Sequence, residues 1–479
     1  MAILPQNFSL LTDLYQLTMA YGYWKEKREE EEATFHLFYR KPPFGGSYAL
    51  TAGLQQAVEF IQNFHLSETE LSYLRGLRGN DGQPLFEEAF LTYLADLRFE
   101  GNLWAMPEGS LVFPHEPILR IEGRLPICQL LETPLLNIIN FQTLIATKAS
   151  RIKQAAGEQA VLEFGLRRAQ GMDGGLSASR AAYIGGCSAT SNVLAGQFFG
   201  IPVKGTHAHS WVMSYEDEAE SFEAYARAMP NNSILLVDTY DTLEGIRKAI
   251  GVGKKLESEG YAFGGVRLDS GDLVRLSIAA REMLDAAGLP EAAVVASNDL
   301  DEFRIQALKA HGAKIDVWGV GTRLATAYDQ PALGGVYKLG AIRTPGEAWR
   351  YKLKLSEQEI KISNPGRLMV KRYQVKGQWV GDVIYDEALG MNGKPEGIPA
   401  EAEAQDVLVP VLQAGEVVFP FPKLADIQAR AKEALQGLPV RMKSLTAPAS
   451  SPVSLAPSLA EKKSILVKEA RGQRVSQPY

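Results

Sequence analysis

The feature that most constrains the fold is an alternation of short β-rich runs with longer helical runs between residues 160 and 322. Segments with a helical pattern, such as DTLEGIRKAIGVGKKLESEG and GDLVRLSIAAREMLDAAG, separate several of the β-rich runs. This alternation indicates βαβ units and a parallel sheet. Six strands without an obvious switch point favour a closed α/β barrel over an open sheet. The runs are AVLEFG (160–165), IPVKGT (201–206), SILLVDTY (233–240), GVRLDS (265–270), AVVASND (293–299) and KIDVWGVGT (314–322).

The segments on either side of this pattern predict a second layer. Residues 1–135 are predicted to contain helices and short strands, and residues 346–440 contain further strand-like segments such as RLMVKRYQV. We expect these two segments to form a sandwich-like α+β domain against a barrel at 136–345. The end of the chain, 441–479, is rich in Ser, Pro and Ala, and has seven Lys or Arg against two acids. Its lack of an apolar period predicts disorder.

Composition excludes several classes of protein. Cys128 and Cys187 are the only cysteines among 479 residues, which excludes a disulfide scaffold or a multi-cysteine metal centre and suits a reducing cytoplasm. Fifty basic against 56 acidic side chains give a net charge of −6, so nothing favours nucleic acid or a membrane surface as a partner. No apolar run reaches the ~18 residues of a membrane span, and no basic segment precedes Asp13 as a signal peptide requires.

The predicted strands end in groups that suit anion and phosphate chemistry. In a barrel the active site lies at these carboxyl ends. Arg167, Arg168, Arg180 and Arg267 match carboxylates or phosphates there, although each alone could form a surface ion pair. Gly319-Val320-Gly321-Thr322 resembles a phosphate loop, with a plain tight turn as the alternative.

Carboxylates and histidines complete the set of candidate groups. Asp238, Asp241, Asp269 and Asp272 could hold a ribose hydroxyl or hydrated Mg²⁺, or could balance arginine charge. His207 and His209 form an H-x-H pair without a third metal ligand at a known spacing. Beside phosphates, such a histidine suits a general base or a phosphoryl acceptor, and a purely structural role is the alternative.

Eight motifs occur in an order that resembles the nicotinate phosphoribosyltransferase family. The resemblance covers about residues 8–420 and implies synthesis of nicotinate mononucleotide and diphosphate from nicotinate and 5-phosphoribosyl 1-diphosphate. It implies coupled ATP hydrolysis through a phosphohistidine, Mg²⁺ bound mainly through the substrate diphosphate, and a cytoplasmic homodimer with shared active sites. The fold expected is the type II arrangement, an irregular α/β barrel plus a sandwich-like domain. The motifs are TDLYQLTMAYGYW (12–24), FYRKPPFGGSYAL (38–50), EFGLRRAQG (163–171), GTHAHSW (205–211), LVDTYDT (236–242), GVRLDSGDL (265–273), SNDLDE (297–302) and VGTRLATAYDQPALGGVYKL (320–339).

The same resemblance implies a role for individual residues. Tyr15 of one subunit and Phe164 of the other would sandwich the nicotinate ring. Arg267 and Thr206 would contact nicotinate, with Arg267 near its carboxylate, and Arg167 would contact the ring side or a phosphate. Asp238 and Asp269 would lie around the ribose and magnesium. Gly321 and Thr322 would cradle the 5-phosphate next to Gly319, and His209 would be the phosphohistidine, while His207 receives no catalytic role.

Other functions remain open at this point. Nicotinamide phosphoribosyltransferase shares the fold, the TDxY tyrosine and a histidine, but GTHAHSW and GVRLDSGDL favour the acid-specific enzyme. Quinolinate phosphoribosyltransferase would be a shorter chain without the histidine motif. An aldolase would place a Schiff-base lysine at a strand end, and none of the six ends offers a convincing one. A non-catalytic metabolite-binding protein on the same fold is the alternative outside enzymes.

Overall fold

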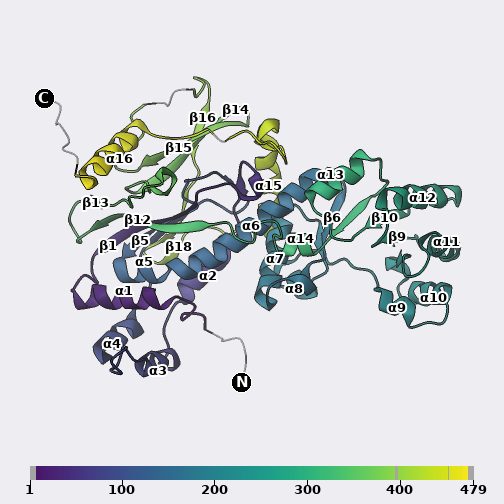
Figure 1. Ribbon diagram of the computed structural model, residues 1–479, viewed down its shortest axis with the longest axis horizontal. Helices are drawn as coiled ribbons and strands as arrows, with labels where there is room; N and C mark the ends of the chain where they lie inside the picture. The colour runs from purple at the N-terminus through teal and green to yellow at the C-terminus, as the bar shows by residue number, and fades with distance from the viewer. Residues whose placement is uncertain (1–6, 394–396, 451, 473–479) are drawn as a thin grey trace. The chain divides into compact units, whose positions relative to one another are not determined.

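The computed structural model describes residues 7–393, 397–450 and 452–472 (Figure 1). The chain forms a mixed α/β fold with two compact units. Unit 1 contains the described residues of 1–143, 332–423 and 433–479, and unit 2 contains 144–331 and 424–432. Within the described residues, no helix combines the length and apolar content needed to cross a bilayer.

A six-stranded parallel sheet forms the centre of unit 2. Its strand order is β7-β6-β11-β10-β9-β8. The β-branched and apolar residues of these strands are largely buried, as is typical of a parallel sheet. The strands are β6 (Ala160–Glu163), β7 (Ala189–Thr190), β8 (Ile234–Leu236), β9 (Gly265–Leu268), β10 (Ala293–Ala296) and β11 (Val317–Val320).

Aspartates begin three of the helices that follow these strands. Asp241 accepts a hydrogen bond from the Glu244 amide, and Asp272 accepts from the amides of Val274 and Arg275. Such caps satisfy amides that the first helical turn leaves unpaired. The helices of unit 2 are α7 (Met172–Ile184), α8 (Val193–Phe199), α9 (His209–Met213), α10 (Glu218–Ala228), α11 (Thr242–Ser258), α12 (Leu273–Ala286), α13 (Glu302–Ala310) and α14 (Thr322–Ala325).

Five of the six predicted runs are strands, and the run at 201–206 is not. It makes only a single bridge, between Val203 and Thr190. Pro202 contributes to the irregularity because it has no amide hydrogen to donate to a ladder. β7, a strand that the sequence pattern did not predict, occupies one edge of the sheet, and β8 occupies the other.

Unit 1 contains strands from both ends of the chain. Its seven-stranded sheet has the order β13-β12-β1-β5-β3-β17-β18, and β12, β1 and β5 lie side by side in Figure 1. β1 pairs with β12, so the strand at 335–343, predicted as part of the barrel segment, lies in unit 1. The strands of this sheet are β1 (Glu32–Tyr39), β3 (Asn102–Ala105), β5 (Leu119–Arg124), β12 (Gly335–Arg343), β13 (Arg350–Tyr351), β17 (Val409–Gln413) and β18 (Glu416–Val417).

Two smaller sheets complete the strands of unit 1. One has the order β16-β14-β15-β19, and the other pairs β2 with β4. Their strands are β2 (Ala49–Leu50), β4 (Leu111–Val112), β14 (Leu368–Val375), β15 (Gln378–Asp386), β16 (Glu403–Asp406) and β19 (Val453–Leu455). The helices of unit 1 are α1 (Leu14–Lys25), α2 (Leu54–Asn63), α3 (Glu68–Gly76), α4 (Glu88–Asp96), α5 (Leu125–Leu130) and α16 (Pro457–Ala470), and two helices, α6 (Glu132–Ala156) and α15 (Leu424–Gly437), contribute residues to both units.

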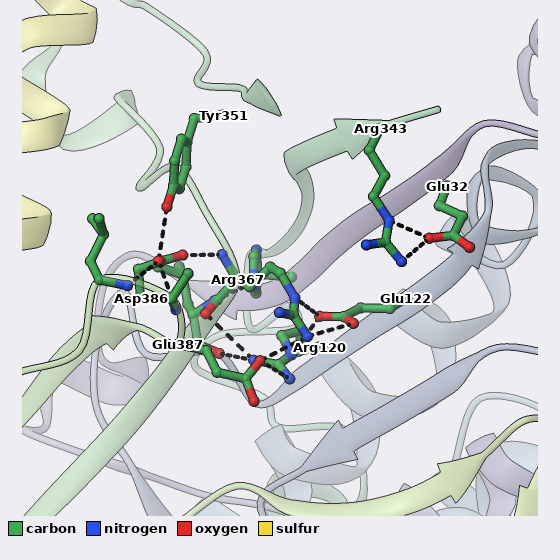
Figure 2. A network of polar contacts seen from close by, with 12 residues as sticks. Glu32, Arg120, Glu122, Arg343, Tyr351, Arg367, Asp386 and Glu387 are labelled. Carbon is green, nitrogen blue, oxygen red and sulfur yellow. Dashed lines mark hydrogen bonds and ion pairs between the residues drawn. The ribbon is translucent and has the colours of Figure 1, made fainter. Parts of the chain in front are cut away.

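A buried ion network ties β5 to the ends of β14 and β15 (Figure 2). The Arg120 side chain is fully buried, with Nε 3.1 Å from Glu122 Oε1 and Nη2 3.1 Å from Glu387 Oε2. Arg367 binds the same two carboxylates at 2.9 and 2.8 Å. Each buried charge therefore has a partner of opposite sign, without which its desolvation would be costly.

The prediction of a disordered tail is wrong for the described part of 441–479. β19 pairs in parallel with β15, and α16 follows it, beginning with Pro457. Ala456 and Leu459 are fully buried. The apolar residues of this segment are too few to form a regular hydrophobic pattern in the sequence. They are nevertheless buried, because the segment packs on the sheet that contains β15. Residues 451 and 473–479 lie outside the described part.

Candidate active site

The carboxyl ends of β8, β9 and β10 bring several predicted residues of unit 2 together. β9 pairs in parallel with β8 and β10, so side chains that follow these strands meet at one edge of the sheet. Arg267 belongs to β9, Asp238 and Thr239 follow β8, and Ser297 follows β10. The site is therefore assembled by strand register rather than by nearness in sequence.

Arg267 is held by three side chains at this edge. Its Nε donates to Ser297 Oγ at 2.9 Å, Nη1 donates to Thr206 Oγ1 at 3.1 Å, and Nη2 donates to Asp269 Oδ1 at 3.2 Å. Its Cζ atom lies 5.5 Å from the centre of the Phe164 ring. A guanidinium has five N–H groups, so two remain after these three bonds for a bound anion.

Asp238 presents one unpartnered oxygen to the same site. Its Oδ2 accepts hydrogen bonds from the Asp269 amide at 3.0 Å and from Ser270 Oγ at 2.6 Å. Its Oδ1 is buried and has no hydrogen-bond partner among the described residues. A buried carboxylate oxygen without a donor is costly, which makes this atom a candidate for contact with a cation or a ligand hydroxyl.

His209 lies at the start of α9 with its ring beside both carboxylates. Nδ1 is 3.1 Å from Thr239 Oγ1. Nε2 is 3.9 Å from Asp238 Oδ1 and 3.8 Å from Asp269 Oδ2. The side chain is 40% exposed, so the ring is both oriented by its neighbours and accessible to a ligand.

Glycines allow the end of β11 to approach Phe164 closely. A Cβ atom on Gly319 would lie 2.8 Å from Phe164 Cδ2, so a larger residue would displace the ring. The backbones of Gly165 and Gly321 are similarly close, since a Cβ on Gly165 would lie 2.9 Å from Gly321 O. Thr322 begins α14 directly after this contact. The predicted phosphate loop thus lies beside the predicted stacking residue.

The remaining predicted residues are not part of the contacts described above. Arg167 is exposed on a short turn after β6. Tyr15 is on α1 of unit 1, with 48% of its surface exposed. Asp241 and Asp272 cap helices, which is the structural role considered for them from sequence. Arg168 is exposed and Arg180 is buried.

Several residues that organise the site were not among the predicted site residues. Thr239 and Ser297 bind His209 and Arg267, respectively. Glu163 is buried at the end of β6, where its carboxylate accepts bonds from Ser179 Oγ at 2.9 Å and Thr190 Oγ1 at 2.6 Å, and from the Gly165 amide. The available signal was position, because Glu163, Thr239 and Ser297 all stand at or directly after strand ends.

Comparison with known proteins identifies the family. Residues 10–140 match the nicotinate phosphoribosyltransferase (NAPRTase) N-terminal domain, 160–352 match the NAPRTase family, and 392–463 match the nicotinate phosphoribosyltransferase C-terminal domain. A nicotinate phosphoribosyltransferase of Bacillus subtilis is 44% identical over 464 residues, covering 94% of this chain and 93% of its own. The chain belongs to this family. The resemblance drawn from the motifs is therefore confirmed.

Other nicotinate phosphoribosyltransferases support the same assignment. The human protein of this name is 36% identical over 94% of this chain and 95% of its own. The crystal structure of human nicotinic acid phosphoribosyltransferase superposes with a TM-score of 0.82 at 34% identity, covering 95% of this chain and 99% of its own. A nicotinate-nucleotide pyrophosphorylase from Pyrococcus furiosus, at 23% identity and a TM-score of 0.71, shares the fold.

Proposed function

We propose that this chain transfers a phosphoribosyl group from 5-phosphoribosyl 1-diphosphate to nicotinate. The nicotinate nitrogen forms a bond to ribose C1 as the bond from C1 to the diphosphate oxygen breaks, giving nicotinate mononucleotide and diphosphate. The observation that carries the proposal is Arg267, whose guanidinium lies beside Phe164 with two N–H groups left for a carboxylate. Nicotinamide has no such carboxylate.

The residues at the strand ends supply binding and orientation for this reaction. Phe164 would stack on the pyridine ring while Arg267 and Thr206 hold the carboxylate side of nicotinate. Arg167 and the Gly321-Thr322 segment would bind phosphate groups of the second substrate. Transfer at ribose C1 needs the attacking nitrogen in line with the leaving group and a stabilised diphosphate. No protein nucleophile is required for this step.

The site also fits Mg²⁺ bound together with the substrate. Asp238 Oδ1 is buried, accepts no hydrogen bond from the described residues and is an oxygen ligand of the kind that Mg²⁺ prefers. In the described part of the chain, no three His, Cys, Asp or Glu side chains cluster as a metal site. Diphosphate oxygens would therefore supply most of the ligands, and Asp238 or Asp269 would orient the ion or the ribose hydroxyls. Bound Mg²⁺ would offset negative charge on the leaving group.

We propose His209 as the group that couples the reaction to ATP. Its ring would accept the γ-phosphoryl group, forming a P–N bond as the bond to the ADP oxygen breaks. Hydrolysis of the phosphohistidine would then release phosphate and restore the ring. The 40% exposed side chain and its fixed contact with Thr239 support this role, since an acceptor must be both accessible and oriented.

A homodimer in the type II arrangement is part of the proposal. Tyr15 would complete the nicotinate site of the other subunit. Its face of α1 is apolar and exposed, with Leu14 at 53%, Tyr15 at 48% and Met19 at 37%. Exposed apolar patches of this kind mark interaction sites. A cytoplasmic location would suit Cys128 and Cys187, which are both free thiols.

An assay of diphosphate release tests the proposal directly. Purified protein is given 5-phosphoribosyl 1-diphosphate with nicotinate or nicotinamide, each with and without ATP. We expect release with nicotinate, stimulation by ATP and little release with nicotinamide. A preference for nicotinamide would instead identify the amide-specific activity, and no release with either base would indicate a binding protein without catalysis.

A further inference from the structure

The inference concerns His207, which the proposed reaction does not use. β8 is an edge strand and pairs with β9 on one side. Leu236 is the last residue of β8, and its amide donates to Nε2 of His207 at 3.1 Å. The imidazole therefore occupies a place where a further strand would supply a carbonyl. Without this acceptor, a buried amide would lose its hydrogen bond.

The surroundings of His207 keep its ring neutral and fixed. Only 8% of the residue is exposed. The ring packs edge-on against Tyr225 of α10, with centroids 4.7 Å apart. Burial lowers the pKa of His207 to about 4, and the positive charge of Arg267 acts in the same direction. Because Nε2 accepts the Leu236 amide, the proton resides on Nδ1, which points to Ala208 O at 3.4 Å.

Residues on both sides of His207 belong to the candidate active site. Thr206 precedes it and accepts the hydrogen bond from Arg267 Nη1. His209 lies two residues after His207 and contacts Thr239. Asp238 lies two residues after Leu236, directly beyond the end of β8. The bond between His207 and Leu236 thus joins the two segments that carry the candidate phosphohistidine and its neighbouring carboxylate.

We propose that His207 is a positioning residue that holds Thr206 and His209 against the end of β8. The role rests on the proposed function, because it matters through nicotinate binding and phosphorylation of His209. The acceptor at Nε2 is the essential feature, and the ring volume alone does not suffice. This distinguishes His207 from a histidine that merely fills the space beside Tyr225.

Two substitutions separate the acceptor from the volume. His207→Gln places an amide oxygen near the position of Nε2, whereas His207→Phe keeps an aromatic ring without an acceptor. We expect His207→Phe to slow acid-labile labelling by γ-labelled ATP about tenfold and to raise the KM for nicotinate about tenfold, the size of effect that one lost buried bond produces. His207→Gln should stay within about threefold of the wild type in both. Equal losses in the two variants, or wild-type behaviour of His207→Phe, would overturn the proposal.

Two measurements on the full chain do not depend on activity. In protein labelled with ¹⁵N-histidine, the His207 signal, assigned by its loss in His207→Gln, should show an unprotonated Nε2. Hydrogen exchange at the Leu236 amide should be about tenfold faster in His207→Phe. A protonated Nε2 or unchanged exchange would refute the contact even if the wild type proved inactive. If neither variant folds, the His207 signal is assigned in the wild type by sequential backbone correlations, and the protonation of its Nε2 then decides.

Discussion

At the scale of single residues, Arg267 is the group proposed to bind the carboxylate of nicotinate. Ser297, Thr206 and Asp269 use three of its N–H groups and fix the plane of the guanidinium. In the proposed function, the two remaining N–H groups would bind the two oxygens of the carboxylate, and such a bidentate pair adds directional selectivity to charge. Nicotinamide, in contrast, would offer this guanidinium only one oxygen and no negative charge.

Replacement of Arg267 should therefore affect the acid more than the amide. A charge-assisted hydrogen bond contributes roughly 1.5–3 kcal/mol, so Arg267→Ala should lower kcat/KM for nicotinate at least about tenfold. The weak rate with nicotinamide should hardly change. Arg247→Ala, an exposed arginine on α11, is the control for loss of one positive charge. Equal losses with both bases would contradict the carboxylate assignment.

His209 should be separable from sugar transfer. Asn has similar size but carries no labile phosphoryl group, so His209→Asn should abolish ATP hydrolysis and acid-labile labelling from γ-labelled ATP. Slow nucleotide formation without ATP should remain, because that step requires no histidine nucleophile. The matched control is His311→Asn, at the exposed end of α13, which should still be labelled. Persistent labelling of His209→Asn would show that another residue accepts the phosphate.

At the scale of elements, strand packing imposes a strict size limit beside Phe164. Gly319→Ala would place a Cβ atom 2.8 Å from the Phe164 ring, so the ring must move from its position beside Arg267. We expect the KM for nicotinate to rise about tenfold, the equivalent of ~1.4 kcal/mol of lost stacking. Gly251→Ala in α11 meets no atom within 4 Å and should leave the KM unchanged. An unaltered KM in Gly319→Ala would mean that Phe164 does not position the base.

The C-terminal elements should contribute measurably to stability. Leu459 of α16 is fully buried, so Leu459→Ala should lower the free energy of unfolding by about 2–5 kcal/mol. Val440 is 82% exposed, and Val440→Ala should change it by less than about 0.5 kcal/mol. Denaturant unfolding of the two variants measures the difference. If Leu459→Ala unfolds like the wild type, α16 does not pack as described.

The sequence predicted elements where local composition decides the structure. The runs that became β6, β8, β9, β10 and β11 are rich in β-branched and apolar residues, and at their polar ends Asp238 and Arg267 both contact Asp269. The run at 201–206 has the same composition but contains Pro202. The order of the tail depends on a partner strand, β15, about 70 residues earlier. The contact between His209 and Thr239 depends on ring orientation, which sequence spacing does not determine.

At the scale of the whole molecule, the proposed homodimer with shared sites predicts complementation between defective subunits. Tyr15→Ala and Arg267→Ala should each be impaired alone. In a mixed dimer, one site would combine the intact Tyr15 with the intact Arg267, so mixing should restore part of the activity. Subunit exchange is verified with two differently tagged chains. Exchange without any recovery would argue that Tyr15 acts within its own chain.

The strand order of unit 1 has a consequence for how the chain folds during synthesis. β1, β5 and β3 are neighbours in the sheet, and all three lie within the first 124 residues, so they can pair early. β12 must join β1 across a separation of 311 residues between Glu32 and Arg343. After β5 ends at Arg124, the ribosome needs roughly 10–45 s at about 5–20 residues per second to reach Arg343, the end of β12. During that interval the nascent three-stranded sheet has two open edges, a state prone to aggregation. Most of unit 2, residues 144–331, is synthesised between these strands and has time to begin folding before β12 arrives.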